Sequence, residues 1–135
     1  MKFKKLKIDF KDKRGTISDI FYKKNIQHVA IIKSKPNARR GDHYHKKTTQ
    51  WMYITQVSLE YWYKPLKYKG EAKKKVLKVG DLVETPPNEM HALKIGKNGN
   101  EFIVFTRDKE NFKSRVRKLG LDEKKFELYE VDLSN

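Results

Sequence analysis

The chain has 135 residues, enough for one ordinary domain with its own core, so we expect a single domain over residues 1–135. It contains no cysteine, which excludes disulfides, zinc thiolate sites and a cysteine nucleophile. The net charge of +15 favours an anionic partner. Because the lysines are scattered through almost every segment and do not gather on one helix, we expect no nucleic-acid partner.

No stretch of the sequence approaches the roughly 20 consecutive apolar residues of a membrane span. The N-terminal residues alternate between apolar and charged side chains and do not form a continuous apolar run. We therefore expect a cytoplasmic protein without a membrane partner.

The chain shows strand patterns over most of its length. Leu6, Ile8 and Phe10 alternate with charged residues, as in a half-buried strand, and residues 12–15 form a predicted turn. Further strands are expected in the runs 17–22, 29–32, 51–54, 59–63, 75–79, 82–83 and 101–106. The two aromatic-rich runs, 51–54 and 59–63, are separated by a short connection and are expected to pair as antiparallel neighbours.

Short strands with frequent turn residues, not alternating with helices, predict an antiparallel sandwich or barrel. One short helix is expected near the C-terminus, where Phe112, Val116 and Leu119 share a helical face and Gly120 is placed as a cap. A last strand is expected within residues 126–133. The sequence thus predicts an all-β domain with one C-terminal helix.

Three of the four histidines lie in two short segments. His43 and His45 are two residues apart, so in a strand both imidazoles point to the same side. Gln50 lies an odd number of residues from both, so a bulge or bend within 46–49 is needed to bring its side chain to that side. The second segment ends at His91, after a turn rich in proline.

These two segments resemble the two motifs of the cupin superfamily, in which a His-x-His pair, a carboxylate and a later histidine converge inside a small jelly-roll β-barrel. The resemblance covers roughly residues 8–107 and implies the cupin fold. The chain departs from the motifs at four positions. Gln50 replaces the usual glutamate, Val57 and Asn88 replace the usual glycines, and Ile95 replaces the usual final asparagine.

The Gln50 departure bears on metal binding. Two or three neutral imidazoles with a carboxylate form a site for a divalent transition metal, whereas an amide is a poorer ligand and brings no charge. We therefore expect no metal and no other cofactor. If a metal is bound, its expected ligands are His43, His45, Gln50 and His91.

Residues 40–47 followed by Gln50, and the turn at 12–15, are similar to those of one cupin subgroup, the RmlC-like sugar-nucleotide 3,4-ketoisomerases and the related dTDP-4-dehydrorhamnose 3,5-epimerases. This resemblance implies an isomerase or epimerase whose substrate is a nucleotide-linked keto sugar. The reaction moves a proton at a carbon beside a ketone and needs no metal. It implies His43 or His45 as the catalytic base.

The same resemblance implies the groups that bind substrate. Arg40 would bind the diphosphate through paired N–H groups, with Arg39 or a lysine as the alternative, and Gln50 and His91 would contact oxygens of the sugar. The run 29–32 lacks the aromatic residues that those isomerases carry in this strand. One of four aromatic residues would have to take their place: Tyr53, Tyr61, Trp62 or Tyr63. His28 lies outside both motifs and is interpreted as a structural or exposed residue.

The strand at 51–54 carries apolar residues on both faces, which predicts that both faces are covered. Since a single barrel would leave one face in water, we expect a homodimer formed through these strands.

Two other functions stay open from the sequence. One is a metal-dependent cupin of the dioxygenase kind, and the other is a cupin that binds a sugar without catalysis. Fold resemblance alone does not choose among them, because one fold hosts many activities.

Overall fold

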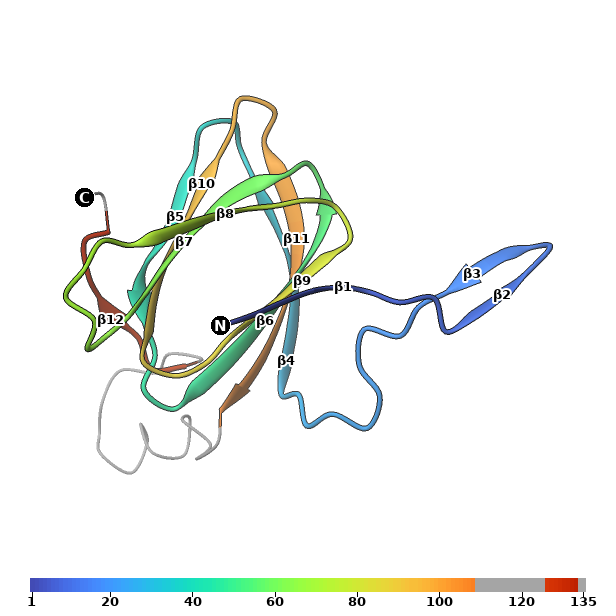
Figure 1. The fold of residues 1–135 in the computed structure, drawn as a ribbon, viewed down its shortest axis with the longest axis horizontal. Coiled ribbons are helices and arrows are strands. Elements are labelled where there is room, and N and C mark those ends of the chain that lie inside the picture. Colours follow the sequence, from blue (N-terminus) through green and yellow to red (C-terminus); the bar gives the residue numbers. More distant parts are fainter. Residues whose placement is uncertain (109–125, 134–135) are drawn as a thin grey trace.

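The structure is a computed structural model that describes residues 1–108 and 126–133. All regular secondary structure in these residues is β-strand, so the all-β class is confirmed (Figure 1). The helix expected around residues 112–119 lies outside the described residues. None of the described residues belongs to a helix long and apolar enough to cross a membrane.

Two five-stranded antiparallel sheets face each other and enclose the core (Figure 1). The first sheet has the order β1 (Lys2–Lys5), β9 (Asp81–Thr85), β6 (Thr48–Gln56), β11 (Asn100–Asp108) and β4 (His28–Ser34). The second has the order β12 (Tyr129–Glu130), β5 (Arg39–Tyr44), β10 (Glu89–Ile95), β7 (Leu59–Pro65) and β8 (Lys73–Leu77). The two sheets are hydrogen-bonded separately, so they do not close into one continuous barrel.

The core is formed by the side chains that alternate inward from both sheets. Its buried members are Met52, Ile54, Leu59, Tyr61, Leu77, Val83, Leu93, Ile95, Phe102 and Val104. β6 and β7 belong to different sheets and both contribute to this cluster, so they lie on opposite sides of the core and not side by side.

The expected pairing of residues 51–54 with 59–63 is therefore wrong. β6 pairs with β9 and β11, while β7 pairs with β8 and β10. The connection at Val57 carries the chain from one sheet to the other. Both strands have inward apolar side chains, and these are buried more fully across a sandwich than within one hairpin.

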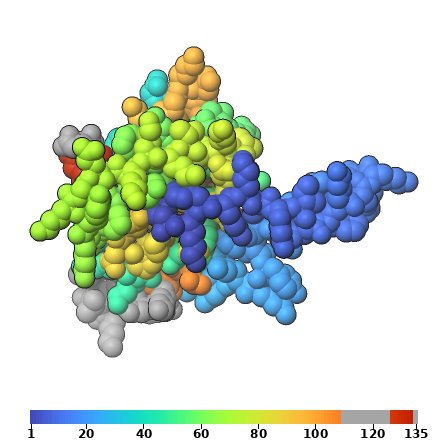
Figure 2. Space-filling model, in the orientation of Figure 1, coloured from blue at the N-terminus to red at the C-terminus, as the bar shows by residue number. Residues whose placement is uncertain are grey.

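The first residues also differ from expectation. The first strand is β1 at Lys2–Lys5, and residues 6–9 are not in a strand. The expected turn at 12–15 is confirmed, since it joins β2 (Phe10–Asp12) to β3 (Gly15–Ile17). This hairpin projects away from the two sheets (Figures 1 and 2). Phe10 and Ile17 are directly opposite each other in it, and both are more than half exposed, at 51% and 57%.

Residues that follow the hairpin cover the outer face of β6. Phe21 packs against Trp51 and Phe105, with ring centroids 5.4 and 4.8 Å away, and Ile20 and Ile26 join the same cluster. Trp51 is consequently only 2% exposed within a single chain. The apolar outer face on which the homodimer expectation was based is thus covered by the chain itself, and the homodimer stays a prediction.

The two positions where cupin motifs usually carry glycine keep a glycine-like backbone. Val57 has φ = 63° and Asn88 has φ = 64°. Asparagine tolerates this left-handed region, whereas a β-branched side chain is strained there. The turns of both motifs are kept although the residues differ, and strain is concentrated at Val57.

We expect Val57→Gly to raise the free energy of unfolding by up to about 1 kcal/mol, because relief of strain of about 1–2 kcal/mol exceeds the entropic cost of glycine. Urea denaturation measures the change. Val57→Ala is the matched control, since alanine keeps the Cβ atom that causes the strain. A Val57→Gly protein less stable than Val57→Ala would contradict this explanation.

Candidate functional site

Three inward-facing side chains of the second sheet form one row. His43 on β5 lies opposite His91 on β10, which lies opposite Tyr63 on β7. Directly paired residues of antiparallel strands point to the same face of a sheet. The register therefore gathers two of the motif histidines, far apart in sequence, in neighbouring positions.

The first sheet contributes a second row. His28 on β4 lies opposite Thr106 on β11, which lies opposite Gln50 on β6. Gln50 reaches this place because the chain leaves β5 after Tyr44 and enters the other sheet at Thr48. The expected bend within 46–49 is therefore the corner between the two sheets.

A cavity of about 270 Å³ lies between the two rows. Its polar lining comes from the residues His28, Arg40, His43, Gln50, His91 and Thr106, and its apolar lining includes Ile32, Met52, Leu93, Phe102, Val104 and Phe126. Small-ligand pockets occupy roughly 300–1,000 Å³, so this one suits a group the size of one sugar ring. A larger ligand would extend out of its mouth.

A bulge in β5 places Arg40 and His43 on the same side. Arg40 is opposite Leu93 and His43 is opposite His91, so one extra residue, Asp42, lies between two regular pairs. Without it, residues three apart would point to opposite faces. Gly41 has φ = 88°, and a Cβ atom there would lie 2.9 Å from the backbone oxygen of His91.

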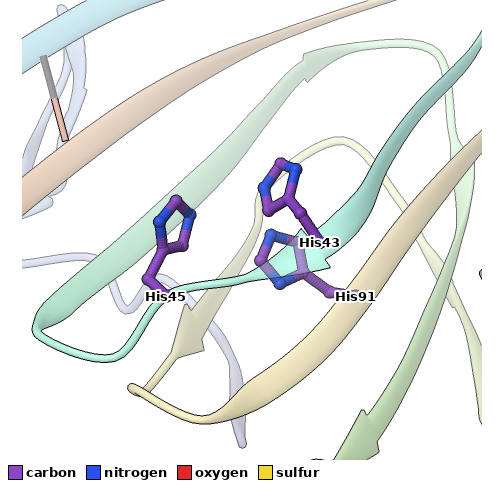
Figure 3. Close-up of side chains that lie close together, drawn as sticks. All are labelled: His43, His45 and His91. Atoms are coloured by element: carbon purple, nitrogen blue, oxygen red, sulfur yellow. The ribbon is translucent and has the colours of Figure 1, made fainter. Parts of the chain in front are cut away.

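The three motif histidines converge (Figure 3). The ring centroid of His43 is 4.9 Å from that of His45 and 4.5 Å from that of His91. One ring nitrogen from each of the three lies within 4.8 Å of the others. His43 and His91 line the cavity, whereas His45 does not; His45 and His91 are both buried.

Burial makes two of these imidazoles weak bases. Loss of water, together with repulsion from the neighbouring imidazoles, lowers the pKa of His43 to about 4 and that of His91 to about 3. Both rings are therefore uncharged at neutral pH. An uncharged imidazole can accept a proton or bind a metal ion.

Backbone carbonyls select one tautomer for two of the rings. Nδ1 of His45 donates to the carbonyl oxygen of Glu127 at 2.5 Å, and Nδ1 of His91 donates to that of Glu89 at 3.1 Å. Because a carbonyl only accepts hydrogen bonds, both Nδ1 atoms carry hydrogen and both Nε2 atoms carry a lone pair. Nε2 of His45 is buried and has no hydrogen-bond partner among the described residues.

Arg40 lies at the edge of the cavity and is held against the opposite sheet. Its Nε donates to Oγ of Ser34 at 2.7 Å, and its Nη2 donates to the backbone oxygen of Lys33 at 3.1 Å. No hydrogen bond found in the described part of the chain uses Nη1. The guanidinium group is therefore fixed in direction and keeps donors for an anion. Arg39 instead pairs with Asp42.

The expected aromatic residues do not line the cavity. Tyr53 packs on the outer face of β6 with Trp51, because it lies an odd number of residues from inward-facing Gln50. Tyr61 is fully buried below the site, where its hydroxyl lies 2.5 Å from Oγ1 of Thr85 and its ring stacks on His91 with centroids 6.2 Å apart. Burial raises the pKa of Tyr61 above its usual range. Tyr53 therefore lies away from the cavity, and the ring of Tyr61 packs against the ring of His91.

Sequence reasoning missed two contributions to the site. His28, interpreted from the sequence as structural or exposed, lines the cavity. In β4 the inward residues His28, Ala30 and Ile32 alternate with exposed Val29 and Ile31, and because the exposed residues are apolar too, the sequence carries no signal of which side faces inward. Glu127 contacts His45 from a segment 82 residues later, and no local pattern reports such a contact.

Comparison with solved structures identifies the fold. The chain is similar to a doubly substituted QdtA 3,4-ketoisomerase of Thermoanaerobacterium thermosaccharolyticum in complex with TDP (22% identity, TM-score 0.65, covering 82% of each chain). It is also similar to the WlaRB TDP-quinovose 3,4-ketoisomerase of Campylobacter jejuni (24% identity, TM-score 0.67, covering 79% of this chain and 84% of that one). A third similar structure is a dTDP-4-dehydrorhamnose 3,5-epimerase of Elizabethkingia anophelis (14% identity, TM-score 0.67, covering 81% and 69%).

The chain therefore has a cupin fold. Within that class it has the RmlC-like form shared by these ketoisomerases and epimerases, as the motif resemblance implied. No protein-family model and no curated protein sequence matches the chain.

Proposed function

We propose that this protein is an isomerase or epimerase acting on a nucleotide-linked keto sugar. The observation that carries the proposal is the convergence of three histidines, two buried and one half-buried, beside one mostly apolar cavity with an arginine at its edge. Two of them, His43 and His91, line the cavity and have lowered pKa values. Structures of the same fold that act on TDP- or dTDP-linked sugars support it.

His43 is the proposed base, because it is uncharged and lines the cavity. It removes a proton from the carbon beside the sugar ketone, and an enolate forms, which is an enediolate where that carbon carries a hydroxyl. In an epimerisation the proton returns to the other face of the same carbon and the ketone is restored. In an isomerisation the hydroxyl proton passes to the former ketone oxygen and a proton is added to the former ketone carbon, so that the ketone forms at the neighbouring carbon. His45 lies next to His43 and is the proposed second proton carrier, through its buried Nε2.

The amide of Gln50 gives this site a donor that a glutamate would lack. Gln50 lines the cavity opposite the histidines, and Thr106 is its neighbour in the same row. Their N–H and O–H groups can donate to the oxygen that becomes negative in the enediolate. His91 cannot do so in its present tautomer, because its only N–H faces Glu89.

The direct test is solvent-hydrogen exchange. The purified protein is incubated in D₂O with a panel of nucleotide-linked 4-keto sugars, and NMR and mass spectrometry report deuterium and product isomers. We expect deuterium at a carbon beside the ketone. Binding without any exchange across the panel would instead support a cupin that only binds the sugar.

We expect Arg40→Ala to raise KM for the nucleotide sugar about 10- to 100-fold and to change kcat little, because a charge-assisted contact to the diphosphate contributes about 1.5–3 kcal/mol. Steady-state kinetics measures both constants. Arg39→Ala is the control, since that guanidinium pairs with Asp42. Equal effects of the two substitutions would contradict the assignment.

A metal-dependent cupin is the second candidate. His43, His45 and His91 fit a divalent transition metal, because their rings converge and Nε2 of His45 is a buried atom without a partner in the described residues. The carbonyl contacts at Nδ1 of His45 and His91 are those that orient metal-binding imidazoles. A bound metal would supply a Lewis acid for a substrate oxygen. Elemental analysis after purification without added metal, with activity before and after chelation, separates the two candidates.

We also propose a homodimer, although not through the face first expected. Val29 and Ile31 are 58% and 64% exposed on the outer face of the edge strand β4, and Phe10 and Ile17 are exposed on the projecting hairpin. A second copy of the chain would remove these apolar side chains from water.

Sedimentation velocity tests the homodimer. We expect a dimer at micromolar concentration that Ile31→Lys shifts toward monomer, because a buried lysine would lose its water of hydration. Val79→Lys is the control, at a valine that is 53% exposed in the turn before β9. A protein that is monomeric at all concentrations tested would refute the proposal.

A further inference from the structure

The carboxylate of Glu127 is buried against the corner that joins the two sheets. It is 6% exposed, although a glutamate is seldom buried without partners. It accepts hydrogen bonds from the backbone N–H groups of Lys46 and of Lys47, the latter at 2.6 Å, and from the hydroxyl of Thr48 at 2.5 Å. Three donors on one buried carboxylate make a strong, directional anchor.

The backbone of the same residue contacts the candidate site directly. The carbonyl oxygen of Glu127 accepts the hydrogen bond from Nδ1 of His45. The side chain of Glu127 therefore fixes residues 46–48, and its carbonyl fixes the imidazole that immediately precedes them. A displacement of Glu127 would move both together.

The residues that follow Glu127 extend this contact along β5. Tyr129 and Glu130 in β12 pair with Tyr44 and His43, and the ring of Tyr129 stacks on that of Tyr44 at 5.2 Å. The backbone N–H of Val131 donates to the carbonyl oxygen of Asp42 at 2.8 Å. The described C-terminal residues thus run beside residues 42–44 of β5, at the edge of the second sheet (Figure 1).

From these contacts we propose that Glu127 is a positioning residue for His45. It holds His45 in the tautomer with hydrogen on Nδ1, so that the basic Nε2 is presented to the histidine cluster. Glu127 itself does not line the cavity, so its effect passes through His45. The catalytic part of this inference rests on the proposed function, whereas the tautomer part stands on the hydrogen bonds alone.

Glu127→Gln is the test variant, because it keeps the shape of the side chain and replaces one acceptor oxygen by an NH₂ group that cannot accept from Thr48 or the backbone. ¹⁵N NMR of histidine-labelled full-length protein reports the tautomer of His45 at a fixed pH. We expect the substitution to convert one dominant Nδ1–H tautomer into a mixture. We also expect kcat to fall about 10- to 100-fold with KM within about twofold, as for a misplaced catalytic group.

Glu130→Gln is the matched control, since Glu130 is exposed on β12. Thr48→Val removes only one of the three donors to the Glu127 carboxylate, so we expect smaller changes in the His45 tautomer and in kcat. This second variant takes the place of Glu127→Gln if Glu127→Gln does not fold. Lower thermal stability with an unchanged His45 tautomer and unchanged kcat would overturn the proposal and leave Glu127 a structural residue. If the unsubstituted protein shows no isomerase activity, the proposed function fails, while the NMR result still decides the positioning role.

Discussion

If the proposed function is correct, we expect the replacement of His43 by asparagine to lower the turnover of a nucleotide-linked keto sugar by about 10²–10⁴-fold, the usual contribution of a positioned proton-transfer group. Asparagine can hydrogen-bond but cannot accept the substrate proton at neutral pH. Substrate affinity changes little, because the diphosphate contacts at Arg40 remain. Kinetics of the substituted protein, with circular dichroism to confirm an all-β fold, measures the effect.

The substitution His45→Asn distinguishes a role of His45 as a proton carrier from a role as a metal ligand. If His45 carries a proton, its loss lowers turnover while the folded state is retained. If the three histidines hold a metal, either substitution removes the ion and lowers thermal stability, because metal binding favours the folded state. Full turnover with both histidines replaced would show that the chemistry lies elsewhere.

We expect the free energy of unfolding to fall steeply as the pH is lowered from about 6.5 toward 4. In the unfolded chain a histidine has a pKa near 6.5, whereas in the folded protein the pKa is about 4 for His43 and about 3 for His91. In this window the unfolded state binds more protons, so stability is fully present above pH 6.5 and is lost on acidification. Each of these histidines contributes a slope of up to about 1.4 kcal/mol per pH unit.

Urea denaturation at several pH values between 7.5 and 4.5 measures this slope. His43→Asn removes one of the titrating groups, so its slope is shallower than that of the unsubstituted protein. Substitution of an exposed lysine, such as Lys97→Ala, leaves the slope unchanged and serves as control. Equal slopes for all three proteins would mean that His43 titrates normally in the folded state. The same shift predicts that kcat/KM keeps its plateau well below pH 6.5.

The sequence predicted the all-β class and the meeting of the motif histidines because both depend on regular spacing. The two-residue period puts His43 and His45 on one side of a strand, and the second motif puts His91 in the neighbouring strand. The period is local, however, and does not say which strands pair. For this reason the partners of β6 and β7 were predicted wrongly although both strands were located.

The remaining features depend on departures from regular spacing or on distant contacts. Arg40 and His43 are three residues apart and share the cavity because Asp42 bulges out of the regular pairing of β5, and the sequence marks that bulge by nothing stronger than Gly41. Tyr53 was placed in the site by residue type, while its odd spacing from Gln50 turns it outward. The contact between Glu127 and His45 joins residues that are 82 apart in the sequence, so no local sequence pattern predicts it.

The extra residue in β5, Asp42, also affects how the C-terminal residues are attached to the second sheet. Asp42 could be deleted without disturbing the facing of Arg40 or His43, because the pairs Arg40–Leu93 and His43–His91 would then follow in unbroken register. The presence of Asp42 instead adds hydrogen-bond acceptors at the edge of the second sheet. Its carbonyl and carboxylate oxygens accept hydrogen bonds from the N–H groups of Val131 and Leu133. Asp42 therefore attaches residues 131–133 to β5, while the facing of the cavity residues stays the same.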